Sequence, residues 1–139
     1  MTLGIITAIL VLSILVEGIE LLVVKIASGL TVDYLTNNRT DYFNIRNKLP
    51  ILGLKVIYTF LAALLAGWLG SKITRYYQFL FSIILTILQG IAFLYAMLFS
   101  EFKNTLPKHL WLLLLTVVLV GINIGYMISR NTKTNTKIL

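Results

Sequence analysis

The sequence predicts an all-α membrane protein that folds as a bundle of four transmembrane helices. Three observations lead to this fold class: 58% of the 139 residues are hydrophobic, only 12% are charged, and long apolar stretches follow one another along the chain. A soluble domain typically carries about a quarter charged residues, and the mean hydropathy here is +0.91. The composition therefore excludes a disordered chain, and the absence of cysteine excludes a disulfide-stapled secreted module.

Each apolar stretch is long enough to cross a bilayer. A hydrocarbon core of roughly 30 Å requires about 20 helical residues at about 1.5 Å each. The stretches are continuous, which is typical of helices, and we expect the whole chain to form a single transmembrane domain. The predicted helices cover about residues 3–24, 51–69, 79–99 and 110–128.

Proline and aromatic residues mark the ends of these helices. Pro50 and Pro107 precede the second and fourth helices, where a missing N–H is tolerated. Aromatic side chains near helix ends are typical of the membrane interface. Here they are Trp68, Tyr76, Tyr77 and Trp111.

A polar connection at residues 28–49 is the only sizeable segment predicted outside the membrane. It is too short for a domain, and we expect Tyr34, Tyr42 and Phe43 to hold it against lipid headgroups. A basic tail at residues 129–139 follows the fourth helix, and we expect it to lack regular structure.

The basic residues give little asymmetry from which to predict orientation. Four helices place both termini on one face, with five basic residues there and six on the other face. The very short turn after the second helix favours cytoplasmic termini, and we expect the inner membrane of a bacterial cell. The balanced count also permits an antiparallel homodimer; the simpler alternative is that a partner or the translocation machinery sets the orientation. The two sets are Lys72, Arg75, Arg130, Lys133 and Lys137, and Lys25, Arg39, Arg46, Lys48, Lys103 and Lys108.

Three ionisable residues lie at similar depth in the first two predicted helices. Glu17 and Glu20 are about 6 Å and about 10 Å from the predicted midplane, and Lys55 is about 7.5 Å from it on the same side. A charged group at membrane depth costs about 2.5–3.5 kcal/mol on insertion scales, so it needs a partner or a purpose. We predict an ion pair of Lys55 with either Glu17 or Glu20. For Glu20 and Lys55, snorkelling to the interface is the alternative.

One lysine cannot neutralise two glutamates. We therefore expect the deeper Glu17 to take up and release a proton, as a proton-coupled carrier or relay requires. Ser13 extends the two glutamates into one stripe with i, i+4, i+7 spacing.

Each of the other helices also carries a stripe of small or polar residues. One interpretation is a hydrated path or small-solute pocket lined by Glu17, Lys55, Gln89 and Asn123. The other is that interhelical hydrogen bonds and close helix contacts only hold the bundle together. The stripes are Lys55, Thr59, Ala62, Ala66 and Gly70, then Ser82, Thr86 and Gln89, then Thr116 and Asn123 with the small-xxx-small pair Gly121 and Gly125.

Nothing in the sequence favours an enzyme. His109 is the only histidine, and no Cys/His metal-ligand spacing, nucleophile elbow or phosphate loop occurs. We expect no catalytic residue, metal or cofactor. The net charge of +7 is spread over both faces, so we expect no nucleic-acid partner. The expected partners are the lipid bilayer and either further copies of the chain or a larger membrane complex.

Several short segments resemble uncharacterised small four-helix bacterial membrane proteins. They are Val16-Glu17-Gly18, residues 66–72 at the end of the second helix, and Pro107 with Trp111. This resemblance covers most of the chain and implies the four-helix fold without an activity.

The segment Leu15-Val16-Glu17-Gly18 is also analogous to the first helix of the small multidrug resistance transporters, which exchange protons for cationic drugs through a membrane-embedded glutamate. The chain departs from that family in its long connection, in Glu20 and Lys55, and in a third helix without the family's aromatic-Trp-Gly signature.

Two functions therefore remain open. In the first, the chain is a small transport or permeation protein, with Glu17 as the proton- or cation-responsive group and Lys55 as its counter-ion. In the second, it is a non-catalytic accessory or assembly subunit, whose polar stripes only bind helices to one another or to a partner.

Overall fold

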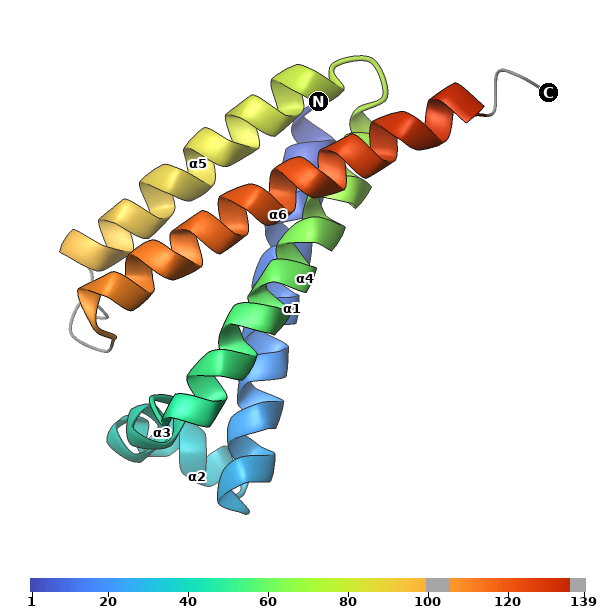
Figure 1. Cartoon of the computed structure of the whole chain (residues 1–139). Helices are drawn as coiled ribbons and strands as arrows, with labels where there is room; N and C mark the ends of the chain where they lie inside the picture. The colour runs from blue at the N-terminus through green and yellow to red at the C-terminus, as the bar shows by residue number, and fades with distance from the viewer. Residues whose placement is uncertain (100–105, 136–139) are drawn as a thin grey trace.

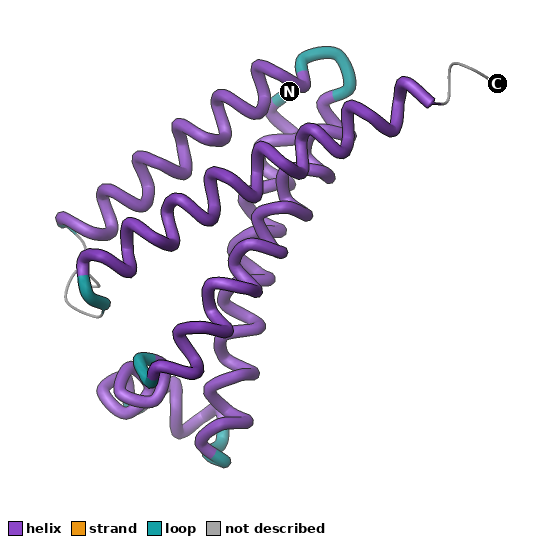
Figure 2. The backbone as a smooth tube through the Cα atoms, viewed as in Figure 1, coloured by secondary structure: helices purple, strands orange, loops and turns teal. Residues whose placement is uncertain are grey.

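The chain folds entirely into helices in the part that the structure describes. The structure is a computed structural model that describes residues 1–99 and 106–135, with side chains up to residue 130. These residues contain no strand, so the predicted all-α fold is confirmed (Figures 1 and 2). The helices are α1 (Thr2–Ser28), α2 (Val32–Asn37), α3 (Arg39–Arg46), α4 (Leu49–Thr74), α5 (Gln78–Leu98) and α6 (Lys108–Asn135).

Four helices, α1, α4, α5 and α6, are long and apolar enough to cross a membrane. Large apolar side chains stay exposed on each of them, for example Ile14, Leu61, Ile87 and Leu112. Such residues are stable in contact with lipid rather than with water. The chain is therefore a membrane protein. The start of α1 and the end of α6 lie at the same end of the bundle (Figure 1).

Helices α1, α4 and α6 extend beyond the predicted apolar stretches because backbone signals, not hydropathy, set their ends, whereas α5 differs from its predicted range by one residue at each end. Helix α1 continues to Ser28 and stops at Gly29, whose φ of 69° is left-handed and whose N–H bonds the carbonyl of Lys25. Helix α4 begins at Leu49 with Pro50 in its first turn.

The prediction of an irregular basic tail is wrong for its first part. Helix α6 continues to Asn135, because residues 129–135 contain neither glycine nor proline to stop it. Residues 136–139, and the basic residues Lys103 and Lys137, lie outside the described part of the chain.

The polar connection contains two short helices rather than an open loop. The hydroxyl of Thr31 caps α2 by accepting a hydrogen bond from the N–H of Tyr34, and the Tyr34 hydroxyl donates to Asp41 on α3 at 2.8 Å. Helix α3 packs against α1 and α4. Its Tyr42 points to the protein interior instead of the headgroups.

The bundle consists of two helix pairs, α1 with α4 and α5 with α6, that cross and then diverge away from the chain ends (Figure 1). Glycine makes the crossing close: a Cβ on Gly121 would lie 2.8 Å from the Cβ of Ala63, and one on Gly125 would lie 2.8 Å from the amide nitrogen of Trp68. Ala62, Ala66 and Gly70 are buried on α4. All five predicted packing residues therefore lie at helix contacts.

Candidate functional site

A buried carboxylate lies where α1, α3 and α4 meet. The Glu20 side chain forms an ion pair with Lys55 of α4 and lies 3.5 Å from the guanidinium of Arg46. Tyr42 donates a hydrogen bond to one carboxylate oxygen at 2.8 Å, and Tyr58 donates to the other at 3.2 Å. We call these five residues the Glu20 cluster.

The cluster explains how charge is accommodated inside the bundle. Glu20 is only 7% exposed, and a buried carboxylate is costly unless charged or polar donors satisfy its oxygens. Here each oxygen accepts from a tyrosine and faces a cation. Burial first, and then the negative charge of Glu20, raises the pKa of Tyr42 on α3 above its ordinary value, so its hydroxyl stays a donor.

Of the two partners that the sequence left open for Lys55, the structure places Glu20 against it. Glu17 is exposed and makes no ion pair or hydrogen bond with the described residues. Lys55 is 9% exposed, and its ammonium group pairs with Glu20 inside the bundle.

The difference between the two glutamates follows from the buried ridge of α1. The residues of that ridge are four or eight positions apart, and they include Glu20. Glu17 is three residues earlier, which turns its side chain by about 60° around the helix. Ser13 is exposed as well, so Glu20 is the one residue of the predicted stripe that lies on the buried face of α1. The ridge consists of Gly4, Ala8, Leu12, Glu20 and Val24.

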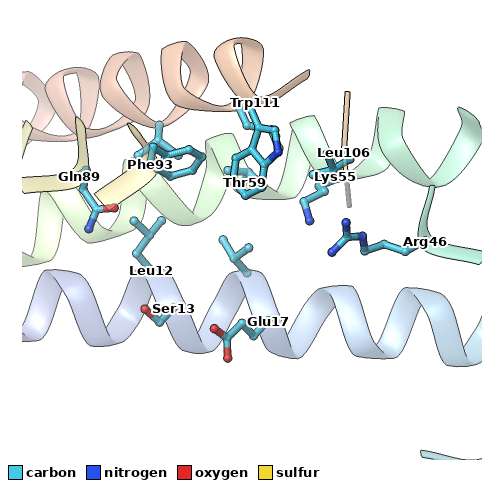
Figure 3. A pocket seen from close by; sticks show the side chains of 13 residues that line it. Leu12, Ser13, Glu17, Arg46, Lys55, Thr59, Gln89, Phe93, Leu106 and Trp111 are labelled. Atoms are coloured by element: carbon cyan, nitrogen blue, oxygen red, sulfur yellow. The ribbon is translucent and has the colours of Figure 1, made fainter. Parts of the chain in front are cut away.

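A cavity of about 290 Å³ lies beside the Glu20 cluster, between the diverging helix pairs (Figure 3). Leu12 points toward the other labelled side chains, whereas the carboxyl group of Glu17 points away from them. Residues from α1, α3, α4, α5 and α6 line the cavity, and Glu17 contributes to its rim. The polar lining includes Arg46, Lys55, Thr59 and Gln89, and the apolar lining includes Leu12, Val16, Phe93, Leu114 and Val118.

Two lining residues carry buried polar atoms that have no hydrogen-bond partner among the described residues. They are the hydroxyl of Thr59, a side chain that is 3% exposed, and the indole nitrogen of Trp111. The Trp111 ring packs edge-on against Phe93, with ring centroids 6.0 Å apart. Buried polar groups are normally satisfied, and both of these atoms belong to residues that line the cavity.

The predicted lining is only partly brought together. Gln89 is buried and lines the cavity, whereas Asn123 is not among its lining residues. The Asn123 side chain instead accepts from Ser82 at 2.9 Å and donates to Thr86 at 3.3 Å and to the Leu119 carbonyl at 2.8 Å. Asn123 therefore joins α5 to α6, as the structural interpretation of the polar stripes expects.

Sequence reasoning did not find three members of the Glu20 cluster. Tyr58 is three residues after Lys55 and so shares its helix face, which is a signal that spacing offers. Tyr42 and Arg46 are four residues apart and so share one face of α3. Nothing in the sequence indicates that this face contacts Glu20. Helix α3 reaches Glu20 only because the connection folds back on the bundle.

No group of three His, Cys, Asp or Glu side chains that could hold a metal ion occurs within residues 1–99 and 106–130. No family model, curated protein or solved structure matches this chain.

Proposed function

We propose that the chain is a small membrane transport protein whose solute-binding site is the cavity beside the Glu20 cluster. The observation that carries this proposal is the cavity of about 290 Å³ with Lys55 and Arg46 in its wall, at the ends of the two helix pairs that diverge. Ionisable side chains at membrane depth are typical of solute and proton pathways. Pockets between helices of a bundle are a common place for ligands.

The arrangement of the helix pairs supplies a means of changing access to the cavity. The pairs touch closely at Gly121 and Gly125 and separate toward the cavity. A small rotation of α5 and α6 about this crossing would widen or close the cavity, as one rigid helix pair moves against another in many transporters.

The two glutamates have different roles in this proposal. Glu20 stays ionised between its donors and holds Lys55 and Arg46 at the cavity wall. Glu17 lies exposed on the cavity rim, so it is the carboxyl group that exchanges protons or attracts a cation during transport.

Flux into proteoliposomes tests this function. Purified protein is reconstituted with an internal pH dye, and uptake is followed for the proton, for tetraphenylphosphonium as a cation and for octanoate as an anion. We expect flux above empty liposomes for at least one of them, a loss with Lys55→Met, and no loss with Lys25→Met, a matched change at an exposed lysine outside the cavity. Flux of all three equal to that of empty liposomes contradicts the proposal.

The same flux assay tests the role of Glu17 with a separate variant. Glu17→Gln preserves shape and removes titration, so proton-coupled flux should fall while the protein stays folded. Equal flux in Glu17→Gln contradicts the proton role. An accessory subunit would instead retain a larger partner in constant stoichiometry during purification in mild detergent, without flux of its own. A homo-oligomer is expected for the transport protein, since four helices alone enclose little volume.

We propose further that the chain resides in the bacterial inner membrane with cytoplasmic termini. The chain has no cysteine, so single cysteines report topology without background. An impermeant maleimide added to intact cells should label Asn37→Cys between α2 and α3 and leave Tyr76→Cys in the α4–α5 turn unlabelled. The reverse pattern contradicts this orientation, and labelling of both indicates insertion in both directions.

A further inference from the structure

The wall of the cavity offers more hydrogen-bond donors than acceptors. The Lys55 ammonium has three N–H donors, and its bond among the described residues goes to Glu20. An indole nitrogen is a donor only, and that of Trp111 has no acceptor among the described residues. The buried Thr59 hydroxyl adds a third unsatisfied group four residues along α4 from Lys55. Such a wall suits a ligand that supplies acceptor oxygens.

The charges of the lining residues favour an anion for the same position. Lys55 and Arg46 bring two positive charges to the wall, and Glu20 is the acidic side chain that contacts both among the described residues. The carboxyl group of Glu17 points away from this wall (Figure 3).

The rest of the cavity is apolar and larger than an ion needs. Its volume of about 290 Å³ corresponds to roughly ten water molecules at about 30 Å³ each. Leu12, Val16, Phe93 and Val118 form its apolar side. A ligand that fits both sides has an oxyanion at one end and a hydrocarbon body at the other.

We propose that the cavity binds an anionic amphiphile, whose carboxylate or phosphate accepts hydrogen bonds from Lys55, Thr59 and Trp111 while its hydrocarbon body lies along Leu12, Val16 and Phe93. This inference rests on the proposed function only in taking the cavity as the ligand site. It names the class of ligand. That ligand is an anion, whereas the analogy with the small multidrug resistance transporters implies cationic substrates.

Trp111 itself provides the measurement. The chain has two tryptophans, and Trp68 lies on α4 with the Lys72 ammonium 4.2 Å from its ring. Trp68→Phe leaves the indole in the cavity wall as the only tryptophan, and bromine atoms quench its fluorescence at short range. The full chain in detergent micelles is titrated with a brominated fatty acid, a brominated phosphatidic acid, and the brominated amine and alcohol of the same chain length as the fatty acid.

We expect saturable quenching by the fatty acid, the phosphatidic acid or both, and only weak, unsaturated quenching by the amine and the alcohol. Comparing the titration with the fatty acid to that with the phosphatidic acid distinguishes a free carboxylate ligand from a phosphate headgroup. Equal quenching by the amine or the alcohol overturns the inference, because an apolar crevice alone then explains binding.

Two variants locate the anion. Thr59→Val keeps the ion pair and the side-chain shape, and should weaken binding about fivefold, as loss of one hydrogen bond predicts. Lys55→Met combined with Glu20→Gln removes both charges of the pair together and should weaken it about tenfold or more. Lys25→Met should bind like the parent. Unchanged affinity in both cavity variants, with helicity and elution volume preserved, overturns the inference.

The outcome is separable from that of the proposed function. Flux of tetraphenylphosphonium without anion-selective quenching removes this inference and leaves transport standing. Anion-selective quenching without flux of any probe leaves the ligand assignment standing and removes transport.

Discussion

The ammonium group of Lys55 on α4 contacts the carboxylate of Glu20 on α1, 35 positions earlier in the chain. The contact joins the two helices that flank the polar connection, and Arg46 of α3 meets the same carboxylate. Three separate elements are thus fixed to one buried charge.

Glu20→Gln should destabilise the fold more than Lys55→Met does. Removing one member of a buried ion pair typically costs about 3–5 kcal/mol. Lys55→Met leaves Glu20 with Arg46 and two tyrosines, whereas Glu20→Gln leaves two neighbouring cations without their shared carboxylate. Thermal unfolding in detergent measures the order. The double variant should be more stable than the sum of the single losses predicts, and strict additivity would contradict the pairing.

Tyr42→Phe should release α3 from the bundle without disturbing the transmembrane helices. It removes the 2.8 Å hydrogen bond to Glu20, and bonds to charged groups contribute about 1.5–3 kcal/mol. Hydrogen exchange should accelerate at the amides of residues 39–46 and stay unchanged in α6. Tyr34→Phe is the control, because it removes only an exposed bond to Asp41. Equal acceleration in both variants would show that the Glu20 contact does not hold α3.

The stability of the protein should fall at alkaline pH through Tyr42. Burial and the neighbouring Glu20 charge raise the pKa of Tyr42 above the ordinary 10.0. A folded-state pKa above the unfolded value contributes stability that is complete below about pH 10 and is lost as the pH rises beyond it. Unfolding measured from pH 8 to 11 should decline less steeply in Tyr42→Phe than in the parent. Parallel profiles would contradict the assignment.

Gly121→Ala should loosen the crossing of α4 and α6, whereas Gly90→Ala should be tolerated. An added Cβ at Gly121 would lie 2.8 Å from the Ala63 Cβ, but nothing lies within 4 Å of one at Gly90. In a helix, alanine in place of glycine is otherwise favourable by about 1 kcal/mol. The melting temperature should therefore fall with Gly121→Ala and stay level or rise with Gly90→Ala. A matching rise in both would contradict the close contact.

Asn123→Leu should reduce stability and leave ligand binding unchanged, whereas Gln89→Leu should alter binding. Asn123 bonds Ser82 and Thr86 between α5 and α6, and such bonds in membranes average about 0.6 kcal/mol. Gln89 lines the cavity. The quenching assay with Trp111 separates the two effects, and a binding defect in Asn123→Leu at full helicity would contradict this division.

The fold was predictable because lipid imposes a simple length and composition rule on each of the four spans. The positions of Gly121 and Gly125 at a helix contact followed from their spacing for a similar reason. The choice between Glu17 and Glu20 was not predictable, since it depends on which face α1 turns to α4, and a helix that is apolar all round gives little indication of that face.

The contribution of α3 to the site was also beyond sequence reasoning. Hydropathy places Tyr42 and Arg46 outside the membrane, and their contacts with Glu20 depend on how the connection folds back against α1 and α4. The same holds for the cavity, which exists because the two helix pairs diverge. Divergence is a property of packing angles that the order of residues along one helix does not reveal.

The short helix α3 reaches from the aqueous side to a carboxylate that the bundle encloses. A nanobody raised against the outer face of this helix would therefore detect whether Tyr42 and Arg46, on its inner side, still hold the helix to the interior charge. Clones selected on the parent protein should discriminate it from Glu20→Gln, although the substituted atom lies beneath the epitope. Helix α3 thus provides an accessible epitope, and a nanobody bound there could hold the protein in one conformation for imaging.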